Sequence, residues 1–90
     1  MALALLTTTA FEKDVRRAKR QGRDLDKMEA IVSLLQARAE LPVRCHPHPL
    51  RGAWAGHWDC HVEPDWFLLY RVTETELILV RTGTHSELFG

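Results

Sequence analysis

Four side chains in the second half of the sequence can transfer protons: His48, His61, Asp65 and His85. They stand in turn-rich or strand-like segments instead of along one helix. Histidine ionises near neutral pH, with an unperturbed pKa of about 6.5, so an imidazole can act as an acid or as a base. This set of side chains predicts acid–base catalysis near neutral pH.

The composition predicts one domain over residues 1–90, because 90 residues with 46% hydrophobic content suffice for a single core. Twelve basic and twelve acidic residues give a formal net charge of zero, so the total charge predicts no polyanionic partner. The segment from Lys13 to Lys27 is nevertheless locally basic, with seven basic residues against three acidic ones. A polyanion should therefore meet the N-terminal half first, although an ordinary solvated helix face explains the pattern equally well.

Two helices are expected in the first half. A capping-box pattern at Thr9 and Glu12 predicts a helix over residues 9–21 that ends at Gly22. Asp24 can cap a second helix, whose apolar residues recur at helical spacing to residue 39 and which Pro42 cannot continue far. The two helices should form a hairpin, with most of their basic residues in solvent.

The second half changes to the alternating pattern of β-strands after an irregular loop. Strands are expected over residues 57–62, 66–72 and 77–81, with residues 2–6 as a possible edge strand. We therefore expect an α+β domain of order β-α-α-β-β-β, in which the helical hairpin packs on one face of a small antiparallel sheet. The opposite face should carry Asp59, His61 and Arg81, and loops should bring His48 and His85 to it.

Several segments of the second half occur in the order that is typical of a known family. They are His48-Pro-Leu50, Gly52-x-Trp54-x-Gly56, Asp59-Cys-His-Val-Glu-Pro-Asp-Trp66, Leu69-Tyr70 and Arg81-Thr-Gly-Thr-His-Ser-Glu-Leu-Phe89. A single short motif would mean little, whereas this many in one order make chance similarity unconvincing. Together they resemble the YafQ branch of the RelE/ParE-like toxins of type II toxin–antitoxin systems.

The resemblance implies a RelE-like domain that acts as a ribosome-dependent mRNA endoribonuclease, an mRNA interferase, and that needs neither a metal nor an organic cofactor. It also implies three kinds of partner: a cognate antitoxin, the ribosome with its RNA, and mRNA. Operator DNA would be contacted only through the antitoxin. Such cleavage uses the ribose 2′-hydroxyl as nucleophile, with one group as base, another as acid, and positive charge on the phosphate.

Family positions match His48, His61, Asp65 and His85 to the active site and place Trp66 and Phe89 beside it. Our preferred hypothesis makes His85 the acid or phosphate-stabilising group, while the other three share base and orienting roles. Arg81 is a candidate contact of the scissile phosphate. The predicted ribosome-binding residues are basic residues of the first helix and its turn: Lys13, Arg16, Arg17, Lys19, Arg20 and Arg23.

Some of these residues also have structural interpretations. Trp66 and Tyr70 share a strand face, which favours the core over base stacking. Asp65 follows a proline and is a natural turn former. Phe89, near the C-terminus, suits either a clamp over the site or a contact with a base.

Two alternatives to the nuclease remain. A metal site at His57 and His61 with Asp59, Cys60 or Cys45 is disfavoured, because residues four apart in a strand are separated by roughly 13 Å. A non-catalytic protein- or ligand-binding domain, such as an inactive toxin homologue, is the more serious alternative. The apolar start is too short for a membrane span and lacks a signal-peptide pattern, so we expect a cytoplasmic protein that contacts no membrane.

Overall fold

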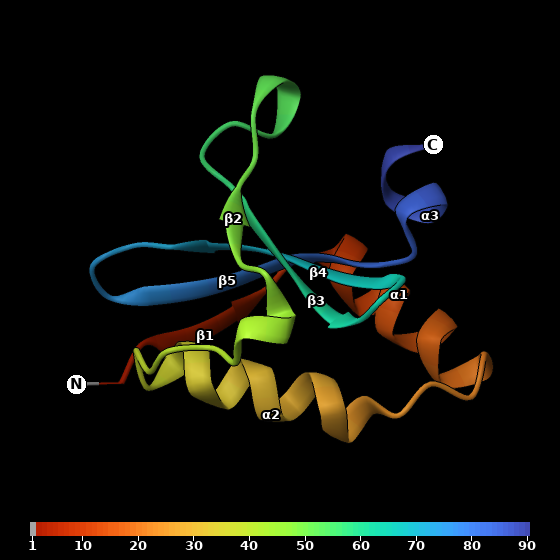
Figure 1. The fold of residues 1–90 in the computed structure, drawn as a ribbon, viewed down its shortest axis with the longest axis horizontal. Coiled ribbons are helices and arrows are strands. Elements are labelled where there is room, and N and C mark those ends of the chain that lie inside the picture. Colours follow the sequence, from red (N-terminus) through yellow and green to blue (C-terminus); the bar gives the residue numbers. More distant parts are fainter. Residues whose placement is uncertain (1) are drawn as a thin grey trace.

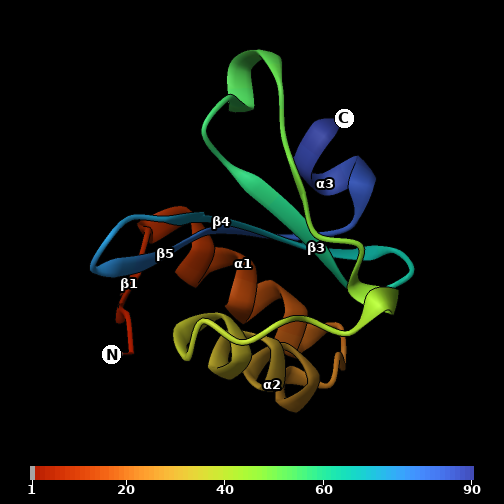
Figure 2. The same cartoon turned by 60° about the vertical axis from the view of Figure 1, so that its left-hand side comes forward.

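A five-stranded β-sheet with helices on both sides forms the structure, a computed structural model that describes residues 2–90 (Figure 1). In chain order the elements are β1 (Ala4–Thr7), α1 (Thr9–Arg20), α2 (Leu25–Gln36), the 3-10 turn η1 (Val43–Cys45), β2 (His48–Pro49), the 3-10 turn η2 (Gly52–Trp54), β3 (Trp58–Glu63), β4 (Trp66–Val72), β5 (Glu76–Gly83) and α3 (His85–Phe89). Figure 2 shows α1 and α2 on one side of the sheet, and α3 with the β2–β3 connection on the other. The predicted α+β class and the helical hairpin are confirmed.

Side-chain caps set where the two long helices begin. Thr8, one residue before the predicted cap, accepts a hydrogen bond from the backbone of Phe11 at 3.0 Å. Asp24 caps α2 as expected, through the backbone N–H of Asp26 at 3.1 Å. The second helix ends at Gln36, earlier than its apolar pattern suggested, and Arg38 then takes a positive φ of 60°.

The sheet has the order β1-β5-β4-β3-β2, and β1 runs parallel to β5. The sheet is thus mixed, where a wholly antiparallel one was expected. Period-two patterning shows which face a residue uses but carries no information about the direction of a distant neighbouring strand. The other pairings are antiparallel, and β4 has the bounds that the sequence predicted.

The core lies between the helices and the sheet. Phe11, Met28 and Ile31 of the helices pack on a sheet face that includes Leu68 and Leu77, both fully buried. Burial of such side chains supplies the main driving force for holding the hairpin on the sheet. Trp66 and Tyr70 belong to this core, as their shared strand face predicted.

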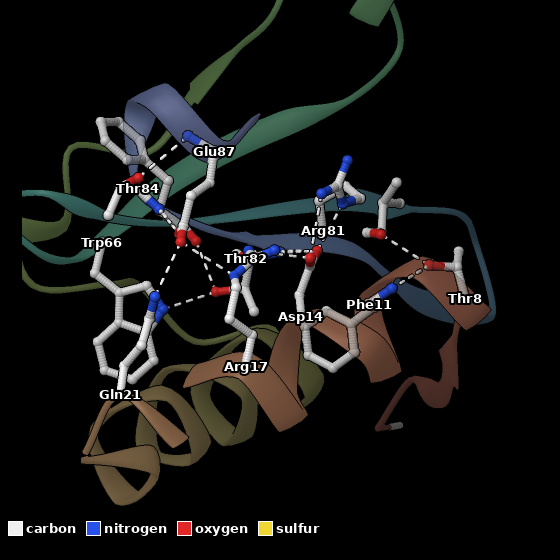
Figure 3. Close-up of polar contacts among 12 residues, drawn as sticks. Thr8, Phe11, Asp14, Arg17, Gln21, Trp66, Arg81, Thr82, Thr84 and Glu87 are labelled. Carbon is white, nitrogen blue, oxygen red and sulfur yellow. Dashed lines mark hydrogen bonds and ion pairs between the residues drawn. The ribbon is translucent and has the colours of Figure 1, made fainter. Parts of the chain in front are cut away.

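The C-terminal half of β5 extends past β1, and side chains of the α1 region take the place of a neighbouring strand there (Figure 3). The Thr8 hydroxyl donates to the carbonyl of Val80 at 2.7 Å. The Asp14 carboxylate accepts from the backbone N–H of Thr82 at 3.1 Å, and Arg17 donates to the carbonyl of Thr82 at 3.3 Å. These bonds satisfy backbone groups that would otherwise lie unpaired and align α1 with β5.

Candidate active site

A continuous row of aromatic rings and imidazoles lies over the sheet face that α1 and α2 leave uncovered. His61 of β3 is 4.5 Å from Phe67 of β4 between ring centroids. Phe67 in turn lies 6.1 Å from His85, and His85 lies 5.1 Å from Phe89. Residues from β3, β4 and α3 therefore form one surface, because the register pairs His61 with Phe67 and α3 follows β5 directly.

His61 has a defined tautomer when its ring is neutral. Its Nδ1 lies 3.1 Å from the carbonyl oxygen of Pro64, which can only accept a hydrogen bond. The Nδ1 atom must then carry the proton, and the lone pair is left on Nε2. A half-buried neutral imidazole with a free Nε2 is suited to act as a general base.

The place of His85 is fixed at the start of α3. Thr84 and Glu87 form a reciprocal capping box, in which the Thr84 hydroxyl accepts from the Glu87 backbone and the Glu87 carboxylate accepts from that of Thr84. The Asp65 carboxylate accepts from the backbone N–H of His85 at 3.2 Å. Asp65 thus orients the helix that carries His85, while the His85 side chain itself is exposed to solvent.

Glu87 also clamps α3 to α1. Its Oε2 atom lies 3.1 Å from Nε of Arg17 and accepts from the Gln21 amide at 3.0 Å (Figure 3). The hydrogen bond from the Thr84 backbone, assisted by Gln21 and Arg17, lowers the pKa of the Glu87 carboxyl. Gly83 makes this close approach possible, because a Cβ there would lie 2.8 Å from both Arg17 and Glu87.

His48 reaches the same face from β2, which pairs with β3 so that His48 opposes Asp59. Its Nε2 atom lies 3.0 Å from Oδ1 of Asp59, and its Nδ1 atom lies 3.0 Å from the carbonyl oxygen of His46. Asp59 is only 3% exposed, and burial raises the pKa of its carboxyl while the charges of His48 and His61 oppose that rise. The expected open position of Asp59 was wrong, because β2 and the His48 ring lie against it.

The surface beside His61 is hollowed by a cavity of about 640 Å³ between α2 and β3, lined by Lys27, Arg44 and His46 among others. Of the four predicted catalytic residues, only His61 lines this cavity. The other three lie on the open face around the aromatic row. The imidazoles and aromatic rings thus lie along an open face, and His61 connects this face to the cavity.

Comparison with known proteins identifies the family of this chain. The sequence model described as "Bacterial toxin of type II toxin-antitoxin system, YafQ" matches residues 3–90. The chain belongs to the YafQ toxin family. The resemblance seen in the sequence is thereby confirmed.

The similarity extends to characterised relatives and to solved structures. The mRNA interferase toxin YafQ of Escherichia coli (strain K12) is 43% identical over 81 residues, which are 89% of this chain and 88% of that protein. The crystal structure of the E. coli DinJ-YafQ toxin-antitoxin complex contains a chain with a TM-score of 0.92 and 38% identity, with full coverage of both chains. The crystal structure of YafQ from E. coli strain BL21(DE3) has a TM-score of 0.93 and 38% identity, covering 98% of this chain and 99% of that one.

Two residues predicted to bind substrate have other partners in this member of the YafQ family. Arg81 forms a bidentate ion pair with Asp14, at 2.6 and 3.1 Å, which raises the pKa of its guanidinium. Trp66 is fully buried, and its Nε1 donates to the Thr82 hydroxyl at 2.8 Å. Arg81 is therefore turned over the edge of β5 toward α1, and Trp66 supports the sheet from the core side.

The predicted ribosome-binding residues also divide into two groups. Arg17 is held by Asp14 and Glu87, and Arg23 lies 5.3 Å above the Trp66 ring. These two are exceptions to the expectation that most basic residues of the helices lie in solvent. Side chains of the other group are exposed: Lys13, Arg16, Lys19 and Arg20.

Sequence reasoning missed the aromatic residues that connect the imidazoles. Phe67 sits between His61 and both His85 and Phe89, and Trp54 lies 6.4 Å from Phe89. Alternation in β4 could have found Phe67, because it faces away from the buried Leu68. Trp54 belongs to the Gly52-x-Trp54-x-Gly56 segment, but nothing in the spacing of that segment indicates that the β2–β3 connection folds toward α3.

The alternative metal site is not assembled within residues 2–90. No group of three or more His, Cys, Asp or Glu side chains in that part of the chain can hold a metal ion. His57 instead has its Nδ1 atom 3.1 Å from the carbonyl oxygen of Trp54. Cys45 and Cys60 are buried free thiols, and burial raises the pKa of Cys60 to about 12. None of the helices in residues 2–90 has the length and apolar character needed to cross a membrane.

Proposed function

We propose that this chain is the toxin of a type II toxin–antitoxin system and inhibits translation as a ribosome-dependent mRNA endoribonuclease. Its YafQ relative at 43% identity is named an mRNA interferase toxin. The observation that carries the proposal is the row of His61, Phe67, His85 and Phe89, which joins proton-transfer groups to aromatic rings on one exposed face. Residues 1–90 act as a single toxin domain.

The chemistry follows from the free ring atoms. His61 Nε2 takes the proton of the ribose 2′-hydroxyl, and this oxygen attacks the adjacent phosphorus while the bond to the 5′-oxygen breaks. His85, protonated and exposed, donates a proton to that leaving oxygen or neutralises the phosphate oxygens. Asp65 orients the helix that carries His85, and His48 supplies a further imidazole at the β2 end. Each acid or base contributes typically about 10² to 10⁴ in rate.

The aromatic residues provide the contact with the substrate. Single-stranded RNA is bound largely by stacking of its unpaired bases on aromatic rings. Phe89, half-buried beside His85 and near Trp54, is placed to hold a base next to the scissile phosphate. The ribosome holds the mRNA with its reacting groups aligned, and this positioning further raises the rate of cleavage. No metal or organic cofactor has a role in this scheme.

The partners follow from the family and from charge. The exposed Lys13, Arg16, Lys19 and Arg20 on α1 dock on ribosomal RNA, and Arg17 and Arg23 serve the fold instead. A cognate antitoxin restrains the toxin, in line with the solved toxin-antitoxin complex of a relative. Operator DNA is contacted only through that antitoxin. The protein works in the cytoplasm, where translating ribosomes are, and needs no membrane.

Replacement of His85 by alanine tests the proposal. We expect induced expression of the parent protein to arrest growth and to produce mRNA fragments with defined ends. The H85A variant should cleave mRNA on programmed ribosomes about 10² to 10⁴ times more slowly. It should still fold and bind its antitoxin, since the His85 ring is exposed and lies only beside Phe67 and Phe89.

Ser86→Ala is a matched control, because Ser86 is the exposed neighbour of His85 on α3. It should leave cleavage unchanged. Full cleavage by H85A would remove His85 from the mechanism. Absence of cleavage by the parent protein would favour the alternative, a non-catalytic homologue that only binds other molecules.

A further inference from the structure

The cavity of about 640 Å³ beside His61 lies at an edge of β3 that β2 leaves uncovered. The short β2 pairs with β3 only at Trp58 and Asp59, so within residues 2–90 the later part of β3 has no neighbouring strand on that side. The 3-10 turn η1 lies there instead, between β3 and α2 (Figure 1, Figure 2). The volume is in the range of about 300 to 1,000 Å³ that is typical of small-molecule sites.

The lining of this cavity combines apolar and basic side chains. Ile31 from α2 and Val62 from β3 are apolar and largely buried. Lys27, Arg44 and His46 are basic and exposed. A nucleotide has the same two characters, because its base has apolar faces and its phosphate is an anion.

Arg44 is the basic residue of the cavity that remains available to an anion. Lys27 is already paired with Glu63, at 2.9 Å between Nζ and Oε2. The hydrogen bond to Glu63 raises the pKa of the Lys27 ammonium, and the charge of Arg44 opposes that rise, so Arg44 lies close enough to act on the same space. Within residues 2–90 the Arg44 guanidinium forms no ion pair. Its planar, forked donors suit the oxygens of a phosphate.

A buried neighbour holds Arg44 and His46 at the cavity. Cys45 stands between them, is 1% exposed and belongs to the core, so η1 is anchored on β3 while the two basic side chains stay outside. The His46 ring lies edge-on to the His61 ring, with 5.7 Å between their centroids. The cavity is therefore continuous with the row of rings on the open face.

We propose that this cavity binds the nucleotide on the 5′ side of the cleaved bond and that Arg44 binds the phosphate 5′ to that nucleotide. The inference rests on the proposed nuclease and adds a substrate subsite to it. His61, as the base, acts on the ribose that supplies the 2′-hydroxyl, whereas the leaving 5′-oxygen belongs to the next nucleotide, beside His85 and Phe89. The substrate strand then runs from the cavity toward α3 in the 5′ to 3′ direction.

A pair of dinucleotides tests this subsite in the purified toxin. Both consist of two adenosines, and the first sugar lacks its 2′-hydroxyl so that the probe cannot be cleaved. One of them carries a 5′-terminal phosphate and the other does not. The parent should bind the phosphorylated probe about fivefold more tightly, as expected of a favourable exposed ion pair. NMR titration measures both affinities, and the amide shifts of Arg44, His46 and Val62 should show that the probe lies in the cavity.

Two substitutions should change this preference in opposite directions. Arg44→Gln should remove it, so that the two dinucleotides bind equally. Glu63→Gln should increase it, because it removes a carboxylate that repels the phosphate and releases Lys27 from its ion pair. The matched control is Arg71→Gln, since Arg71 is an exposed arginine of β4 that does not line the cavity. It should leave the preference unchanged.

Cleavage of mRNA on programmed ribosomes supplies a second readout. A phosphate away from the reacting bond is bound equally in the ground state and in the transition state. R44Q should therefore need a several-fold higher concentration of programmed ribosomes for half-maximal rate and keep a maximal rate near that of the parent. H85A should instead lower the maximal rate.

Three results would overturn the subsite: equal binding of the two dinucleotides by the parent, an unchanged preference in R44Q, or inorganic phosphate that shifts the same amides and binds as tightly as the dinucleotide. Weaker antitoxin binding by R44Q with unchanged dinucleotide binding would assign the cavity to an acidic segment of the antitoxin. The titrations need no cleavage, so they judge the subsite even where the parent is inactive. Absence of cleavage by the parent would count against the nuclease.

Discussion

The two polar regions of this molecule differ in how completely their groups are paired. Under the edge of β5, Asp14 accepts from Arg81, Arg17 and the backbone of Thr82, and Glu87 joins Arg17 to α3. On the open face, the ring nitrogens of His61 and His85 that face solvent have no hydrogen-bond partner among residues 2–90. Paired charges hold elements in place, whereas unpaired imidazoles are available for a substrate.

The comparison also shows how the paired region serves the open one. Asp14 and Arg17 connect α1 to β5, and Arg17 and Gln21 hold Glu87, which belongs to the same short helix as His85 and Phe89. A helix of five residues is not stable alone, so α3 depends on these contacts and on its capping box. A substitution that destabilises the paired region under β5 should therefore also lower the activity of the open face, although to a smaller extent.

Asp14→Asn should produce the largest loss of stability. It leaves Arg81 without a counter-charge and Arg17 with Glu87 alone, both against a buried neutral side chain, and we expect the free energy of unfolding to fall by about 2 to 3 kcal/mol. This figure is below that of a fully buried pair, because both arginines are partly exposed. Urea denaturation followed by tryptophan fluorescence measures it.

Asp26→Asn is the control for this prediction, since Asp26 is an exposed aspartate of α2. It should change stability by no more than a few tenths of a kcal/mol, through the helix dipole. An Asp14→Asn protein as stable as this control would show that the network under β5 does not hold the fold.

Glu87→Gln should have an intermediate effect and act on both regions. The contacts of Glu87 lower the pKa of its carboxyl, so its contribution to stability is complete above its ordinary value of 4.5 and is lost as pH falls through the lower folded value. The variant should unfold more readily than the parent near neutral pH. Its stability should also fall less steeply as the pH is lowered, because the Glu87 carboxylate is no longer there to be protonated. Thermal unfolding at several pH values measures both effects.

The same variant should cleave RNA several-fold more slowly, because α3 would hold His85 less firmly. Glu74→Gln provides the matched control, since Glu74 lies exposed in the β4–β5 turn. A pH dependence identical to that of the parent would mean that the clamp between α1 and α3 contributes nothing.

The smallest effect on the isolated protein is expected from the exposed basic residues of α1. Changing Arg16 and Arg20 to glutamate should leave stability within about 0.5 kcal/mol of the parent and weaken ribosome binding. Binding should also depend less steeply on salt, because fewer counterions are released. Co-sedimentation with ribosomes at several salt concentrations gives the slope, and an unchanged slope would reject this docking surface.

Much of the fold could be predicted because its signals are local. The capping residues, the apolar spacing of α1 and α2 and the alternation in β4 are properties of short windows, and the structure reproduces them within a few residues. The residue types and their order also indicated the family, which the comparisons confirm. The sequence by itself thus determined the element types, the side of the sheet that is core, and the set of groups able to do acid–base chemistry.

The tertiary structure decided which of these groups are free. Arg81 finds Asp14 across 67 residues of chain, Trp66 finds the Thr82 hydroxyl across 16, and β1 runs parallel to β5 through pairing of distant residues. No local sequence pattern encodes such partners, because an arginine or a threonine is the same letter in the sequence whether or not its side chain is paired in the fold. The difference between a structural arginine and one that is free to contact a substrate arises only from the neighbours that folding brings within about 3 Å.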